Sequence, residues 1–126
     1  MPDETTTILI CDDEPSLREL MRISLPSEYS FVEATHAAEA IELVERVQPD
    51  LVLLDVMLPG ASGLTVLESV RSATESRPTP VLVVSAFSAE SDQRAALRAG
   101  ASGFLKKPFD PEELKTLVED LLGART

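Results

Sequence analysis

The sequence predicts a doubly wound α/β fold, in which helices cover both faces of a five-stranded parallel sheet. Short apolar runs alternate five times with segments whose apolar residues recur at helical spacing. Residues 51–54 and 81–84 are continuously apolar, as in central parallel strands that are buried on both faces. Glycine and proline recur at short intervals, so the connections are short. Strand–helix repeats of this kind form a parallel sheet through right-handed crossovers.

The first two repeats end at Pro49. A strand is expected over residues 7–11, followed by a helix from Pro15 to about residue 25. A second strand is expected over residues 29–33, with Thr35 as the N-cap of the helix that Pro49 closes. His36 lies near this helix start without a Cys or a second His at metal-ligand spacing, so we place it on the surface.

Two of the other three repeats begin with the continuously apolar strands. Residues 51–54 end at Asp55, and helical spacing between residues 64 and 70 marks a third helix. Residues 81–84 end at Ser85, and a fourth helix is expected over residues 88–99. Its apolar set is three alanines and Leu97, so it should be weakly anchored and the element most ready to move. A short strand at residues 104–105 precedes a fifth helix, which starts with a capping box at residues 110–113.

Length, composition and charge limit what the chain can be. With 126 residues it fits one domain, whose core we expect over about residues 6–123. No apolar run approaches the roughly 18 residues that cross a membrane, and no signal peptide is evident, so we expect a cytoplasmic protein. Cys11 is the one cysteine and should pack as a small hydrophobe. A net charge of −11 repels nucleic acid and anionic membranes as direct partners.

Residues that directly follow the apolar strands are the candidates for chemistry, because doubly wound sheets bind ligands beyond the carboxyl ends of their strands. These positions hold Asp12, Asp13, Asp55, Ser85, Lys106 and Lys107. Taken alone, the acids at residues 12–14 are better explained as caps of the following helix. Asp55, however, would meet them if the first and third strands are neighbours. Three carboxylates at one sheet edge repel each other unless a hard cation neutralises them, and such an all-oxygen site suits Mg²⁺.

Four motifs stand in order along the chain: ICDDE at residues 10–14, PDLVLLDVMLPG at 49–60, VSA at 84–86 and GASGFLKKPF at 100–109. Together they resemble the receiver domain of bacterial two-component response regulators, over nearly the whole length. The resemblance implies a flavodoxin-like (CheY-like) fold with strand order 2-1-3-4-5, and a single receiver domain over residues 1–126.

The resemblance also implies a role for the motif residues at the sheet edge. Asp55 would be the phosphoacceptor, taking a phosphoryl group from a phosphohistidine on a sensor histidine kinase or phosphotransfer protein. Mg²⁺ would be bound directly by Asp13, largely through water by Asp12, and also by Asp55 and the backbone carbonyl of Met57. Lys107 would neutralise charge on the phosphoryl oxygens, preceded by Lys106 as a solvated neighbour and followed by a cis peptide bond to Pro108.

A switch is implied by two further residues. The hydroxyl of Ser85 would bond a phosphoryl oxygen, and Phe104 would turn inward in response. The altered surface of the fourth helix, fifth strand and fifth helix would act on an output domain or downstream protein, and could also form a homodimer. Met57 and Phe87 would flank the path of an attacking water without orienting it, which predicts slow self-dephosphorylation.

Two alternatives to this interpretation lack residues that they require. An aspartate-nucleophile phosphatase would need an acid at the position of Met57, and a flavin-binding module would need a phosphate-cradling loop at residues 12–15. A binding-only receiver, or a stand-alone phosphorelay receiver without an output domain, would retain the same motifs. We therefore expect a signalling phosphoacceptor that promotes only its own phosphorylation and dephosphorylation, and not an enzyme that acts on other substrates.

Overall fold

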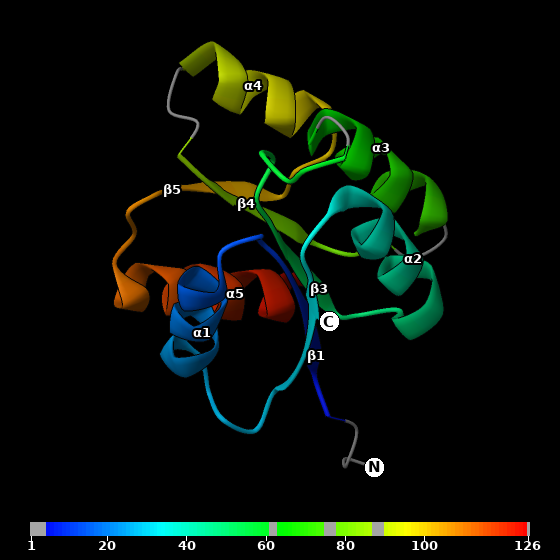
Figure 1. Cartoon of the computed structure of the whole chain (residues 1–126). Coiled ribbons are helices and arrows are strands. Elements are labelled where there is room, and N and C mark those ends of the chain that lie inside the picture. Colours follow the sequence, from blue (N-terminus) through cyan, green and yellow to red (C-terminus); the bar gives the residue numbers. More distant parts are fainter. Residues whose placement is uncertain (1–4, 61–62, 75–77, 87–89, 126) are drawn as a thin grey trace.

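The computed structural model describes residues 5–60, 63–74, 78–86 and 90–125. Strands and helices alternate along this part of the chain, as predicted (Figure 1). The elements are β1 (Thr7–Cys11), α1 (Pro15–Ser24), β2 (Ser30–Ala34), α2 (Ala37–Val47), β3 (Leu51–Leu54), α3 (Gly63–Ala73), β4 (Val81–Ser85), α4 (Glu90–Arg98), β5 (Gly103–Lys106) and α5 (Pro111–Arg125).

The described strands form one parallel sheet in the order β2-β1-β3-β4-β5, which confirms the predicted doubly wound fold. The order reverses at β1, because the chain runs outward to β2 and then returns to β3 on the other side. β1 pairs with β3 in a register that sets Cys11 beside Leu54. The carboxyl ends of these two strands therefore lie next to each other, and the residues that follow them must meet.

Alternate strand positions face opposite sides of the sheet and pack into two apolar clusters. Leu9 and Val52 belong to the cluster under α2, α3 and α4, whereas Ile10 and Leu53 belong to the cluster under α1 and α5. Figure 1 shows these two groups of helices on opposite faces of the sheet. Both faces of the central strands are covered, which explains their continuously apolar sequence.

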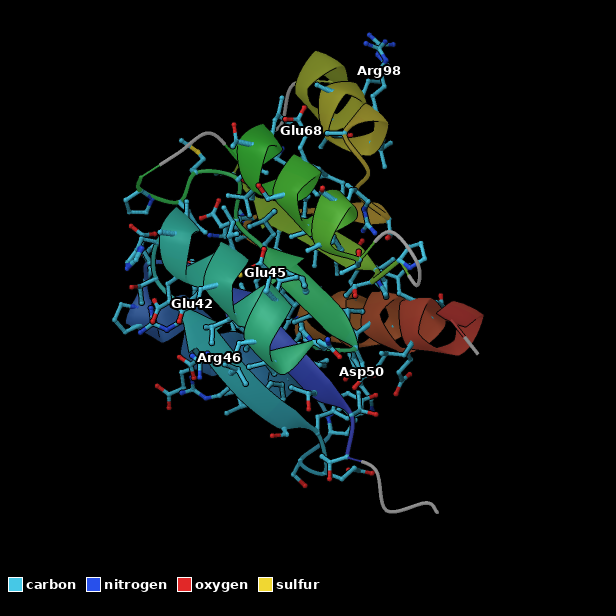
Figure 2. All side chains as sticks on the ribbon, turned by 90° about the vertical axis from the view of Figure 1, so that its right-hand side faces the viewer. Glu42, Glu45, Arg46, Asp50, Glu68 and Arg98 are labelled. Carbon is cyan, nitrogen blue, oxygen red and sulfur yellow. The ribbon has the colours of Figure 1, made fainter. Side chains whose placement is uncertain are left out.

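The outer faces of α2 and α3 are polar. Figure 2 shows Glu42, Glu45 and Arg46 on α2 and Glu68 on α3, and all four side chains are exposed. Glu42 and Arg46 lie one helical turn apart, and their charged groups approach to 3.7 Å. An exposed pair of this kind contributes little to stability, so packing of the inner faces holds these helices on the sheet.

The start of α2 differs from the prediction. The N-cap is His36, whose Nδ1 accepts a hydrogen bond from the backbone N–H of Glu39 over 3.3 Å, and not Thr35. The reason is that β2 continues to Ala34, whose carbonyl accepts the N–H of Asp12 across the sheet, so the chain leaves the sheet one residue later than expected. His36 is exposed, as predicted.

The sequence also makes predictions for the packing of α4 and for the start of α5. In α4, Ala96 is buried while Leu97 is 50% exposed, which agrees with weak anchoring; the movement of α4 stays a prediction. Residues 88 and 89, where the fourth helix was expected to begin, lie outside the described residues. At the start of α5, Asp110 Oδ1 accepts the N–H of Glu112 over 2.9 Å, so Asp110 caps this helix. Among the described residues, no helix is both long and apolar enough to cross a membrane.

Candidate functional site

The sheet places the candidate residues through backbone hydrogen bonds that continue the ladder beyond the strands. The N–H of Asp55 donates to the carbonyl of Cys11 over 2.9 Å, and the N–H of Asp12 donates to the carbonyl of Ala34 over 3.0 Å. At the far side of β4, the N–H of Lys107 donates to the carbonyl of Ser85 over 2.9 Å. Four of the six residues predicted from the strand ends, Asp12, Asp55, Ser85 and Lys107, are therefore held by the backbone at one edge of the sheet.

Asp55 is 7% exposed, and its carboxylate accepts three hydrogen bonds from the described residues. Its Oδ1 accepts the N–H of Met57 over 2.9 Å and the hydroxyl of Ser85 over 3.1 Å. Its Oδ2 accepts the ammonium group of Lys107 over 3.0 Å. A backbone amide, a hydroxyl and a cation thus hold both oxygens, which compensates for the burial of a charged group.

Lys107 bridges two acids. Besides Asp55, its Nζ donates to Oδ2 of Asp12 over 2.7 Å, and the lysine side chain is 12% exposed. Burial by itself lowers the pKa of Lys107, but the hydrogen bonds and negative charges of Asp12 and Asp55 outweigh it, so the pKa lies above its ordinary value. The neighbouring Lys106 is exposed, and the peptide bond between Lys107 and Pro108 is cis, as predicted for both.

The two acids after β1 differ in burial and in hydrogen bonding. Asp12 is fully buried, and besides Lys107 it accepts the N–H of Glu14 at Oδ1 over 2.9 Å. Asp13 is exposed, and its carboxylate accepts no hydrogen bond within the described part of the chain. Glu14 is the N-cap residue of α1 but makes no side-chain cap. Helix capping therefore explains little of this pair.

The donor set fits a hard divalent cation. Asp12, Asp13 and Asp55 each offer a carboxylate oxygen, and these three oxygens lie within 4.8 Å of one another. One of the three acids is exposed and could accept an ion from solvent. Mg²⁺ prefers such oxygen ligands and keeps several waters, so the cluster suits it. The backbone carbonyl of Met57 stays a predicted fourth ligand.

Three of the four predicted switch and water-path residues belong to the part of the chain that the structure describes. Ser85 is buried against Asp55, and Phe104 is partly buried against the cluster under α2, α3 and α4. The side chain of Met57 is 61% exposed beside the site. Phe87 lies outside the described residues. The roles of these residues remain predictions.

A sequence model of the response regulator receiver domain matches residues 8–119. The chain belongs to this family. The receiver domain is 39% identical over 113 residues to an uncharacterised 14.6 kDa protein of Leptolyngbya boryana, covering 89% of this chain and 86% of that protein. It is 40% identical to the probable transcriptional regulatory protein TcrX of Mycobacterium tuberculosis and 41% identical to the response regulator MprA of Mycobacterium leprae, covering 94% and 91% of this chain. It spans 50% of the length of each of these two regulators.

Solved receiver domains share the fold over nearly the whole chain. The receiver domain of a putative LuxO repressor protein from Vibrio parahaemolyticus superposes with a TM-score of 0.89 at 28% identity, covering 97% of this chain and 93% of that one. The receiver domain of the putative response regulator NarL from Mycobacterium tuberculosis gives 0.84 at 35% identity, covering 95% and 98%. A CheY-like receiver from Methanospirillum hungatei gives 0.86 at 27% identity, covering 97% of both chains. The CheY-like fold is therefore confirmed.

One residue in contact with the site was missed by the sequence analysis. Arg18, in α1, donates from Nη1 to the backbone carbonyl of Asp12 over 2.8 Å. The sequence gives only a weak indication of this contact: Arg18 follows Glu14 by four residues, so it lies one helical turn beyond the acidic motif. Solvent-facing arginines are common at such positions, so only the tertiary contact distinguishes this one.

Proposed function

We propose that this receiver domain carries signal by accepting a phosphoryl group on Asp55 in the presence of Mg²⁺. The observation that carries the proposal is the bridge from the Lys107 ammonium group to Oδ2 of Asp55 and Oδ2 of Asp12, 3.0 and 2.7 Å long. A cation in this place can stabilise the charge that spreads over the oxygens of a transferring phosphoryl group. The family to which the chain belongs supports the same role.

The proposed step is a displacement at phosphorus. An oxygen of Asp55 forms a bond to the phosphorus of a donor phosphohistidine, the phosphorus–nitrogen bond breaks, and the histidine nitrogen keeps the electron pair. The N–H of Met57 holds Oδ1 of Asp55 and so sets the orientation of the attacking carboxylate. Asp12, Asp13, Asp55 and the carbonyl of Met57 would hold Mg²⁺, which when bound supplies positive charge to the phosphoryl oxygens.

The proposed output is a change of surface that begins at Ser85. Its hydroxyl donates to Asp55 Oδ1 in the unphosphorylated protein and would turn to an oxygen of the new phosphoryl group. Phe104 on β5 would then move inward, and the surface of α4, β5 and α5 would change. Weak packing of α4 is compatible with such a movement.

The proposed partners follow from the relatives. A sensor histidine kinase or phosphotransfer protein would supply the phosphoryl group, in the cytoplasm. TcrX is named a transcriptional regulatory protein and MprA a response regulator, so an output domain that controls transcription is one proposed target. A match of 113 residues covers 86% of the relative from Leptolyngbya boryana, and a stand-alone receiver is the second candidate. In either case the domain would act only on its own phosphorylation, and a homodimer through α4, β5 and α5 belongs to the same proposal.

Incubation with acetyl phosphate and Mg²⁺ tests the chemistry, with intact-protein mass as the readout. We expect one added phosphoryl group in the unmodified chain and none in Asp55→Asn. Asp50→Asn is the matched control, because Asp50 precedes the same strand at its opposite end and accepts the N–H of Thr7, which an asparagine oxygen can also do (Figure 2). This control should be labelled fully. An unmodified chain that gains no phosphoryl group would leave only a binding role.

A further inference from the structure

Arg18 makes a fork of hydrogen bonds that joins three elements beside the acidic cluster. Its Nη1 donates to the backbone carbonyl of Asp12 at the end of β1 over 2.8 Å, and its Nε donates to Oε1 of Glu33 in β2 over 2.7 Å. The side chain is 15% exposed although it belongs to a surface helix. Such a charge-assisted, planar fork orients the groups that it binds more strictly than a single donor does.

The carbonyl that Arg18 holds belongs to the peptide unit between Asp12 and Asp13. A peptide unit is planar, so the direction of this carbonyl and the direction in which the chain enters Asp13 are linked. Asp12 is held independently by Lys107 and by the N–H of Glu14. The carboxylate of Asp13 accepts no hydrogen bond from the described residues, so its position depends on the backbone that carries it.

Glu33 in turn keeps the guanidinium of Arg18 in place. Its second oxygen, Oε2, accepts a hydrogen bond from Nη1 of Arg22, one turn further along α1. Arg18 and Arg22 therefore share one carboxylate, but only Arg18 reaches the acidic cluster. The two arginines form a natural pair for comparison, because they share a helix and an acidic partner and differ in the contact to Asp12.

We propose that Arg18 is a positioning residue for the cation site: it orients the peptide after Asp12 so that Asp13 presents its carboxylate to Mg²⁺. This inference rests on the proposed function, since it concerns the same ion. Residues that orient metal ligands from outside the ligand set contribute about 10- to 100-fold to metal affinity. Arg18 would therefore strengthen the binding of a cation although it is itself a cation.

The direction of the change in Mg²⁺ affinity distinguishes a positioning role of Arg18 from a simple charge effect. A positive charge next to the carboxylates repels Mg²⁺, so removal of the charge alone should tighten the binding. Removal of a positioning contact should weaken it. Arg18→Met keeps an unbranched stem but loses the charge and every donor, and Arg22→Met makes the same change where no contact to Asp12 exists.

The experiment is a titration of the full chain with Mg²⁺ alone, followed by the amide shifts of the site in ¹H–¹⁵N spectra. We expect the Kd of Arg18→Met to rise about ten-fold, and that of Arg22→Met to stay the same or fall. Arg18→Lys keeps the charge and one donor and should recover part of the affinity. Melting of each variant in EDTA reports whether the metal-free fold is intact; if Arg18→Met does not fold, Arg18→Lys carries the test, with an expected Kd several-fold above that of the unmodified chain.

The outcomes distinguish this inference from the proposed function. An unmodified chain that does not bind Mg²⁺ at all would overturn both. If the unmodified chain binds Mg²⁺ and is phosphorylated, but Arg18→Met binds Mg²⁺ equally or more tightly, the positioning role is wrong and the proposed function stands. Equal weakening in Arg18→Met and Arg22→Met would also overturn the positioning role, because it would trace the effect to Glu33 or to α1 as a whole.

Discussion

Nζ of Lys107 lies 3.0 Å from Oδ2 of Asp55 and 2.7 Å from Oδ2 of Asp12, so one cation binds two buried carboxylates. The third acid of the cluster, Asp13, offers an oxygen within 4.8 Å of theirs and has no ion pair among the described residues. In the metal-free protein the cluster thus carries more negative charge than Lys107 balances. The unbalanced negative charge should therefore increase the affinity for a cation and decrease the stability of the metal-free fold.

Asp13→Asn tests whether the charge of Asp13 has these two opposite effects. Without Mg²⁺, removal of the unbalanced charge should raise the free energy of unfolding by about 1 kcal/mol, the size of a Coulomb interaction between neighbouring exposed charges. With saturating Mg²⁺, the unmodified chain should gain stability. The variant should gain much less, because it lacks the Asp13 carboxylate as a ligand. Urea unfolding in EDTA and in Mg²⁺ measures both. Asp120→Asn, on the exposed side of α5, is the control for net charge; an equal gain there would contradict a local cause.

Met57→Asn tests the predicted slow loss of the phosphoryl group. The exposed thioether of Met57 cannot orient an attacking water, whereas an amide can hold one by a hydrogen bond. We expect the hydrolysis rate of isolated phosphoprotein in Mg²⁺ to rise about ten-fold, since one added hydrogen bond in the transition state is worth about 1.4 kcal/mol. The decay of the phosphorylated mass measures it. Ile23→Asn, at another exposed apolar side chain near the end of α1, should leave the rate unchanged. Rapid decay in the unmodified chain would contradict the prediction.

Gly100 and Gly123 should respond to alanine in opposite directions. Gly100 has φ +114°, and an added Cβ would lie 2.6 Å from Cγ of Arg71. Arg71 cannot move away easily, because its Nε donates to the carbonyl of Gly100 and its Nη2 to that of Thr79. Gly100→Ala should destabilise the fold by about 1–3 kcal/mol.

Gly123 lies within α5, and an added Cβ meets nothing within 4 Å. Gly123→Ala should therefore stabilise the protein by about 0.5 kcal/mol, through its higher helix propensity. Urea unfolding midpoints of both variants measure the difference. If Gly123→Ala lost as much stability as is expected for Gly100→Ala, the backbone conformation of Gly100 would not explain the loss in that variant.

Cys11 should be unreactive in the native protein. The side chain is buried, and burial raises the pKa of its thiol far above the ordinary value, so almost no thiolate is present near pH 8. A thiol reagent such as Ellman's reagent should react only as fast as the protein unfolds, and at once in urea. The absorbance of the released thiolate measures both rates. Prompt reaction of the folded protein would contradict the burial of this residue.

The order of the elements and the site at the sheet edge could be predicted because their signals are local. The continuously apolar run at residues 51–54, for example, predicts a strand covered on both faces, and the acid that ends it predicts a polar group at the edge of the sheet. Element ends depend on longer-range pairing: the sequence predicts Thr35 as the cap of α2, but β2 pairs with β1 as far as Ala34, and His36 is the cap.

Hydrophobic periodicity and motif spacing depend only on neighbours along the chain, so the sequence alone predicts the alternation of strands and helices, the family and the residues at the sheet edge. The tertiary structure determines that Asp12 binds Lys107, whereas the adjacent Asp13 is exposed and contributes an oxygen to the acidic cluster. It also decided that Arg18 joins Glu33 and the carbonyl of Asp12. Such contacts join residues from different strands and helices, and a fork of hydrogen bonds forms only where the folded backbone brings its partners within about 3 Å.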